Sequence, residues 1–196
     1  MNHSSLEIEI HPWHPFTPSD AKILFLGTFP PPQNRWGIDF YYPNKINDFW
    51  RIIGQIFHND YNFFLDPIYK KFDKEKIIHT LNCKHIAIGD SAYKIRRLKG
   101  NASDKFLDVI VPINLAEVLK HIPQCNVIAT TGQKSAEIIA SITNSSIPSI
   151  GSYVITNIND TEIKIYRMPS TSRAYPLALE KKTLYYKTLF NDLKIL

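Results

Sequence analysis

The chain has 196 residues, of which 44% are hydrophobic and 21% are charged. This composition is that of a globular protein and excludes collagen, a coiled coil and an intrinsically disordered chain. The longest apolar runs, such as residues 23–26, are far too short to span a bilayer, and the first ten residues lack the pattern of a secretory signal. We therefore expect a single domain over residues 1–196, monomeric, without a membrane partner and located in the cytoplasm.

The formal net charge of +5 modestly favours a polyanionic partner such as nucleic acid. Cys83 and Cys125 are too few for an iron–sulfur or four-cysteine zinc site, and the seven histidines show no paired metal spacing. The sequence also lacks a phosphate-binding Walker loop, a Gly-x-Ser-x-Gly motif and a dinucleotide fingerprint. It therefore predicts no metal site and argues against the hydrolase, kinase and dehydrogenase classes that these motifs mark.

Short apolar strands alternate with amphipathic helices along the chain. The run at 22–27 is apolar throughout and ends in glycine, as is typical of a strand buried on both faces in a parallel sheet. Further strands are predicted at 85–89 and 126–132, with a terminal pair at 154–156 and 162–166. Helices are predicted at 47–57, 73–81, 114–121, 133–142 and 176–193. The pattern predicts a three-layer α/β/α domain with a short, mainly parallel central sheet and residues 1–20 as an extended N-terminal strap.

In such a fold the loops at the carboxyl ends of the strands form the ligand crevice. The first is Gly27-Thr28-Phe29-Pro30, where glycine permits close approach of a ligand and the following prolines stiffen the rim. An ordinary strand-to-loop turn is the alternative.

The second loop, residues 36–47, is rich in aromatic side chains and ends at Asn47. Phe40, Tyr41 and Tyr42 could stack on a flat base or belong to the core. Asn47 could cap the following helix, or it could position water or read a base edge. Asp39 could orient water, or it could be a surface turn residue.

The third loop carries Ser170, Thr171, Ser172 and Arg173 before the closing helix. Hydroxyl groups, free amides and an arginine at such a place are suited to gripping phosphate. Residues 94–104 form a predicted basic loop that includes Arg96 and Arg97, for which a solvated face is the alternative to a DNA contact.

Taken in order, five segments resemble the uracil-DNA glycosylase superfamily, closest to its DNA-deoxyinosine (hypoxanthine) and mismatch-specific uracil glycosylase branch. They are His14-Pro-Phe16, Ile23 to Pro30, Phe40 to Trp50, the middle segment with Gly89-Asp90, Arg96-Arg97 and Gly100 to Asp104, and Met168-Pro-Ser-Thr-Ser172. Residues 131–136 resemble the family's third strand-to-helix junction. Members of the family flip a damaged nucleotide from DNA and hydrolyse its N-glycosidic bond without a cofactor.

The resemblance implies that Asn47 positions water or the base, with Asp39 as a substitute for orienting water. It further implies that Gly27 to Pro30 and one of Phe40, Tyr41 or Tyr42 line the base pocket. Many family members carry Asp or Asn where this chain has Phe29, and His or Asn where it has Met168, so two usual polar positions are apolar here.

The expected function is therefore a DNA glycosylase that removes a deaminated base, uracil or hypoxanthine, from damaged or mismatched DNA in base-excision repair. A non-catalytic nucleic-acid-binding protein of the same fold and an enzyme acting on free nucleosides are the alternatives.

Overall fold

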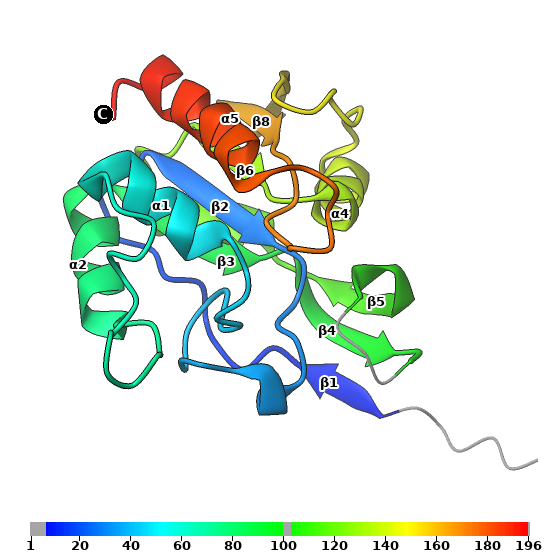
Figure 1. The fold of residues 1–196 in the computed structure, drawn as a ribbon. Helices are drawn as coiled ribbons and strands as arrows, with labels where there is room; N and C mark the ends of the chain where they lie inside the picture. Colours follow the sequence, from blue (N-terminus) through cyan, green and yellow to red (C-terminus); the bar gives the residue numbers. More distant parts are fainter. Residues whose placement is uncertain (1–6, 100–102, 196) are drawn as a thin grey trace, which may run out of the picture.

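The computed structural model describes residues 7–99 and 103–195 (Figure 1). Its main sheet has five strands in the order β3-β2-β6-β8-β7. The first four run parallel to their neighbours, and β7 is antiparallel to β8. The bounds are β2 Ile23–Gly27, β3 Ile86–Asp90, β6 Val127–Thr130, β7 Tyr153–Ile158 and β8 Thr161–Arg167. The predicted mainly parallel sheet is confirmed.

Successive residues of β2 point to opposite faces of the sheet, and each face is covered by its own helices. On one face Ile23 and Phe25 pack with residues of α1 (Phe49–His58), α2 (Lys74–Cys83) and α5 (Leu179–Asp192). On the other face Leu24 and Leu26 pack with residues of α3 (Leu115–Lys120) and α4 (Gln133–Thr143). Figure 1 shows α1 and α5 lying side by side. The predicted three layers are therefore present.

A second, antiparallel sheet was not expected from the sequence. It has the order β1-β4-β5 and is formed by β1 Ile8–Ile10, β4 Ala92–Arg97 and β5 Leu107–Pro112. The prediction of a basic loop over residues 94–104 is therefore wrong for 94–97; residues 100–102 lie outside the described part. Ion pairs with neighbouring strands hold the two arginines of β4, because Arg96 binds Asp108 and Arg97 binds Glu9.

Residues 11–20 lead from strand β4 of the second sheet to the edge of the main sheet. The backbone N–H of His11 donates to the Tyr93 carbonyl, and Phe16 exchanges two backbone hydrogen bonds with Ile88 of the edge strand β3. This pairing covers part of an edge that would otherwise present unpaired backbone groups. Residues 1–6 of the predicted strap lie outside the described residues. Within the described residues, no helix has the length and apolar character needed to cross a membrane.

Candidate functional site

A cavity of about 900 Å³ opens at the carboxyl ends of the parallel strands. Its volume is in the range of ligand-binding sites, and its position is the one that an open α/β sheet offers to ligands. Loops from all three predicted segments line it. Of the predicted site residues, the structure brings together Gly27, Thr28, Phe29, Pro30, Tyr42, Asn47, Ser170, Thr171, Ser172 and Arg173.

The floor of the cavity is formed where β2 and β3 end next to each other. Gly27 and Asp90 are paired in the parallel register, and a Cβ atom added to Gly27 would collide with Oδ1 of Asp90. Glycine is thus needed for the carboxylate to occupy this place. Oδ2 of Asp90 lies 2.9 Å from Nε2 of His11, and both side chains are nearly buried. Burial raises the pKa of Asp90, although the contact with His11 opposes that shift.

Asp104 lines the cavity beside the end of β2. It begins a short 3₁₀ helix, Asp104–Phe106, and its Oδ2 accepts a 2.8 Å hydrogen bond from the Thr28 hydroxyl. The residue is exposed toward the cavity, but protein surrounds its carboxylate on the other sides. This desolvation raises the pKa of Asp104 to about 6, further helped by the nearby charge of Asp90. The sequence placed Asp90 and Asp104 in a family-like segment without assigning them a role.

Tyr42 is the one of the three consecutive aromatic residues that reaches the cavity. Its ring stacks on Phe49 with centroids 4.0 Å apart, and its hydroxyl lies 2.6 Å from the Thr131 hydroxyl. Its backbone has a positive φ of 49°, which turns the chain at this point. Phe40 and Tyr41 are buried and pack in the aromatic core beside Trp50 and Trp13, so for these two the core alternative holds.

Asn47 precedes α1 and contacts its first turn. The Asn47 carboxamide oxygen accepts a 2.9 Å hydrogen bond from the Phe49 backbone N–H, whereas Asp48 occupies the N-cap position without capping the helix through its side chain. Since a backbone N–H requires an oxygen as its acceptor, the contact fixes the orientation of the amide. The NH₂ group of Asn47 is thereby left as a donor at the cavity wall.

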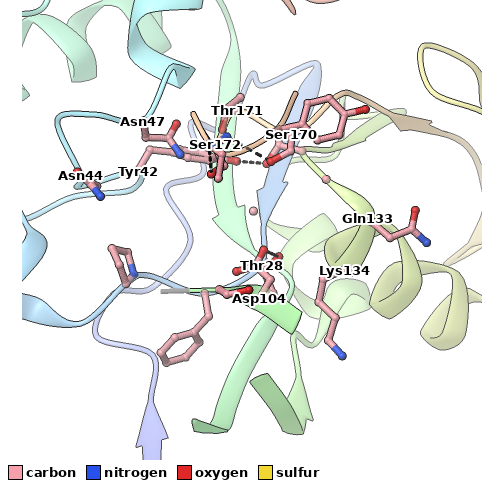
Figure 2. A pocket seen from close by; sticks show the side chains of 18 of the residues that line it. Thr28, Tyr42, Asn44, Asn47, Asp104, Gln133, Lys134, Ser170, Thr171 and Ser172 are labelled. Carbon is pink, nitrogen blue, oxygen red and sulfur yellow. Dashed lines mark hydrogen bonds between the residues drawn. The ribbon is translucent and has the colours of Figure 1, made fainter. Parts of the chain in front are cut away.

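The loop before α5 is fixed against the start of α1. The Asp48 backbone N–H donates to the Thr171 carbonyl, and the Lys182 ammonium donates to the Ser172 carbonyl and to the Asp48 carboxylate. Within the loop, the Ser170 hydroxyl accepts from the Ser172 backbone N–H. Figure 2 shows Asn47 near Ser170, Thr171 and Ser172, with Thr28 and Asp104 across the cavity from them.

Besides the buried Phe40 and Tyr41, three further predicted site residues do not line this cavity. Asp39 is exposed, and its carboxylate accepts a 2.8 Å hydrogen bond from the Trp13 indole N–H. Arg97 is held by both carboxylate oxygens of Glu9 and by the Pro30 carbonyl, and Arg96 pairs with Asp108. These arginines hold the second sheet together.

The cavity wall carries more basic than acidic side chains. Five basic residues line it, namely Arg35, Lys105, Lys134, Arg167 and Arg173, against Asp90, Asp104 and Glu137. Among residues 7–99 and 103–195 there is no group of three or more His, Cys, Asp or Glu side chains arranged to hold a metal ion.

No protein-family model matches the chain, and no curated protein matches it. Among solved structures, the chain is similar to the solution NMR structure of a "putative Uracil DNA glycosylase" from Methanosarcina acetivorans. The TM-score is 0.62 and the identity 17%, and the likeness covers 96% of this chain and 99% of that chain. A likeness at this identity shows the fold, so the chain has the mixed α/β fold of that uracil-DNA glycosylase-like structure.

Proposed function

We propose that this protein is a DNA glycosylase of the uracil-DNA glycosylase superfamily that removes uracil or hypoxanthine during base-excision repair. The observation that carries the proposal is the oriented Asn47 amide, which presents an NH₂ donor to a cavity at the carboxyl ends of the parallel strands. The shared fold and the ordered motifs of the sequence support it.

Hydrolysis of an N-glycosidic bond gives the sugar oxocarbenium character while negative charge gathers on the departing base. A donor fixed before the reaction stabilises that charge without reorganising. Asn47 is such a donor, because its oxygen is occupied by the helix N–H. Uracil and hypoxanthine both present a carbonyl oxygen to which the NH₂ group can donate.

The flipped nucleotide needs a flat apolar surface and a grip on its phosphates. One face of Tyr42 is covered by Phe49, so a base has the other face or the Phe29 ring to stack on. The excess of basic residues at the cavity suits the phosphates, and Arg173, whose side chain is half exposed, stands next to the hydroxyl-rich loop.

The decisive experiment is an excision assay on duplexes and single strands that contain uracil, hypoxanthine, xanthine or a thymine mismatch, with free nucleosides in parallel. We expect abasic sites from uracil or hypoxanthine in DNA and a loss of at least about 100-fold in Asn47→Ala. Tight binding to these duplexes without excision of any base would support the non-catalytic alternative, which the apolar Phe29 and the buried Met168 favour. Cleavage of free nucleosides without excision from DNA would instead support an enzyme that acts on free nucleosides.

A further inference from the structure

Hydrolysis also needs a base that takes a proton from the attacking water, and the two residues expected to orient that water do not supply one, because Asp39 does not line the cavity and Asn47 is an amide. Phe29 has no polar atom, and the carboxamide oxygen of Asn47 accepts the Phe49 N–H. The base must therefore come from another element of the cavity wall.

Three carboxylates line the cavity. Asp90 lies at the floor, engaged by His11 and covered by protein. Glu137 lies on α4 and accepts a hydrogen bond from the exposed Gln133. Asp104 opens to the cavity, unlike Asp90, and its Oδ2 is held by the Thr28 hydroxyl at the end of β2, whereas Glu137 is held by its neighbour on the exposed face of α4. The second oxygen of Asp104, Oδ1, has no hydrogen-bond partner within residues 7–99 and 103–195.

The following proposal rests on the glycosylase function proposed above. We propose that Asp104 is the catalytic base, whose Oδ1 orients and deprotonates the water that attacks the sugar. The water oxygen forms a bond to C1′ as the bond from C1′ to the base nitrogen breaks. The electron pair of that bond goes to the base, and the water proton goes to Asp104. The base then takes up a proton from solvent, and Asp104 later releases one, so that one water is consumed per base released.

The surroundings of Asp104 suit a base that works near neutral pH. Burial and the Asp90 charge raise its pKa, whereas the Thr28 hydroxyl, Arg97 on β4 and Lys134 on α4 lower it, and the balance is a pKa of about 6. Asp104 is therefore mostly ionised at pH 7 and protonated below pH 6. Its basicity exceeds that of an ordinary aspartate, which strengthens proton abstraction.

The test is single-turnover excision by Asp104→Asn, on the uracil or hypoxanthine duplex that the wild-type protein cleaves. Asparagine keeps an oxygen for the Thr28 hydroxyl, so the fold is retained, but it cannot take the proton. We expect the rate to fall at least about 100-fold with duplex affinity unchanged or increased. The matched control is Asp160→Asn, in the exposed β7–β8 turn away from the cavity, which removes the same charge and leaves the rate unchanged.

The pH profile separates a catalytic base from a structural residue. The wild-type rate should fall tenfold per unit as the pH drops below about 6, and the residual rate of Asp104→Asn should lack this acidic limb. Thr28→Val removes a hydrogen bond that lowers the pKa of Asp104, so its acidic limb should move to higher pH.

A wild-type protein that excises bases, combined with an Asp104→Asn rate within about threefold of it, would overturn the proposal and leave the glycosylase function standing. A wild-type protein that excises no base would remove both. An acidic limb that survives in Asp104→Asn would assign that titration to another group and likewise overturn the role of Asp104.

Discussion

The Lys182 ammonium lies 2.8 Å from Oδ2 of Asp48, and the two side chains are only 1% and 6% exposed. The same ammonium donates to the Ser172 carbonyl. A single buried cation therefore joins the closing helix α5, the start of α1 and the hydroxyl-rich loop. Removing two charges from water costs free energy, and the attraction between the two ions offsets that cost. The loss of either partner is therefore expected to destabilise the folded protein.

We expect Lys182→Met to lower the free energy of unfolding by about 3 kcal/mol, because it removes the buried cation of the Asp48 carboxylate and leaves the half-exposed Arg173 beside it. Urea denaturation of the purified variant measures this. The double variant Asp48→Asn with Lys182→Met removes the orphaned charge and should recover much of the loss. A double variant that is as unstable as the sum of its single changes would show that the two residues are not coupled.

The role of Asn47 as a donor is tested by Asn47→Asp. Aspartate keeps an oxygen for the Phe49 N–H and suits the start of a helix, so the free energy of unfolding should stay within about 0.5 kcal/mol of wild type. It lacks the NH₂ group, so excision should slow at least about 100-fold. Single-turnover rates and urea melts separate the two effects. Full activity in Asn47→Ser, which also lacks the carboxamide, would refute the assignment.

The proposed contact of Arg173 with DNA is open to a direct test, because its side chain is half exposed at the cavity even though its Nε lies 3.4 Å from Oδ1 of Asp48. If it contacts phosphate, Arg173→Ala should weaken binding to damaged and undamaged duplexes alike and reduce the slope of log affinity against log salt by about 1. If it fills the gap left by the flipped nucleotide, only lesion duplexes should lose affinity.

Titrations at several salt concentrations decide between these two roles of Arg173. Lys120→Ala, which removes an exposed lysine of α3 paired with Glu117, is the control and should leave the slope unchanged. Unchanged affinity, slope and lesion preference in Arg173→Ala would remove Arg173 from the DNA interface.

Gly27 leaves no room for a side chain beside Asp90. Gly27→Ala should displace the carboxylate at the cavity floor and lower the free energy of unfolding by about 1–3 kcal/mol, as overpacking does. The rate of base excision should also fall, because the carboxylate at the cavity floor is displaced. Gly37→Ala is the matched control, since its added carbon would meet the Pro43 carbonyl at an ordinary 3.4 Å. Equal melting midpoints for the two variants would contradict the close approach of Gly27 to Asp90.

Asp104 also makes the stability depend on pH. Its pKa is about 6 in the folded protein against about 4 in an unfolded chain, so the folded state loses stability relative to the unfolded state as the pH rises from 4 to 6. Asp104→Asn should therefore raise the thermal midpoint above that of wild type at pH 8. This gain in thermal midpoint should vanish near pH 4. A gain of equal size at pH 4 and pH 8 would mean that the ionisation of Asp104 is not its cause.

The helices and the strands of the main sheet could be predicted from the sequence because their signals are local. The apolar run of β2 and the spacing of apolar residues in α1 depend on neighbours within a few positions of the chain. The sequence also predicted that three loops meet at one edge of the sheet, because neighbouring parallel strands end on the same side of it. Gly27, Asn47 and the loop around Ser170 accordingly lie together in the structure.

The remaining features were decided by partners that are distant in sequence. Arg97 belongs to a strand because Glu9 neutralises it, and Lys182 turns inward because Asp48 lies opposite it. The spacing between Lys182 and the buried Tyr186 could have indicated that Lys182 lies on the buried face of α5. A lysine at such a position usually points to solvent, however. Asp104 meets Thr28 across 76 positions of the chain. The cost of burying a charge depends on what surrounds it in three dimensions, so the placement of these groups is a property of the tertiary structure alone.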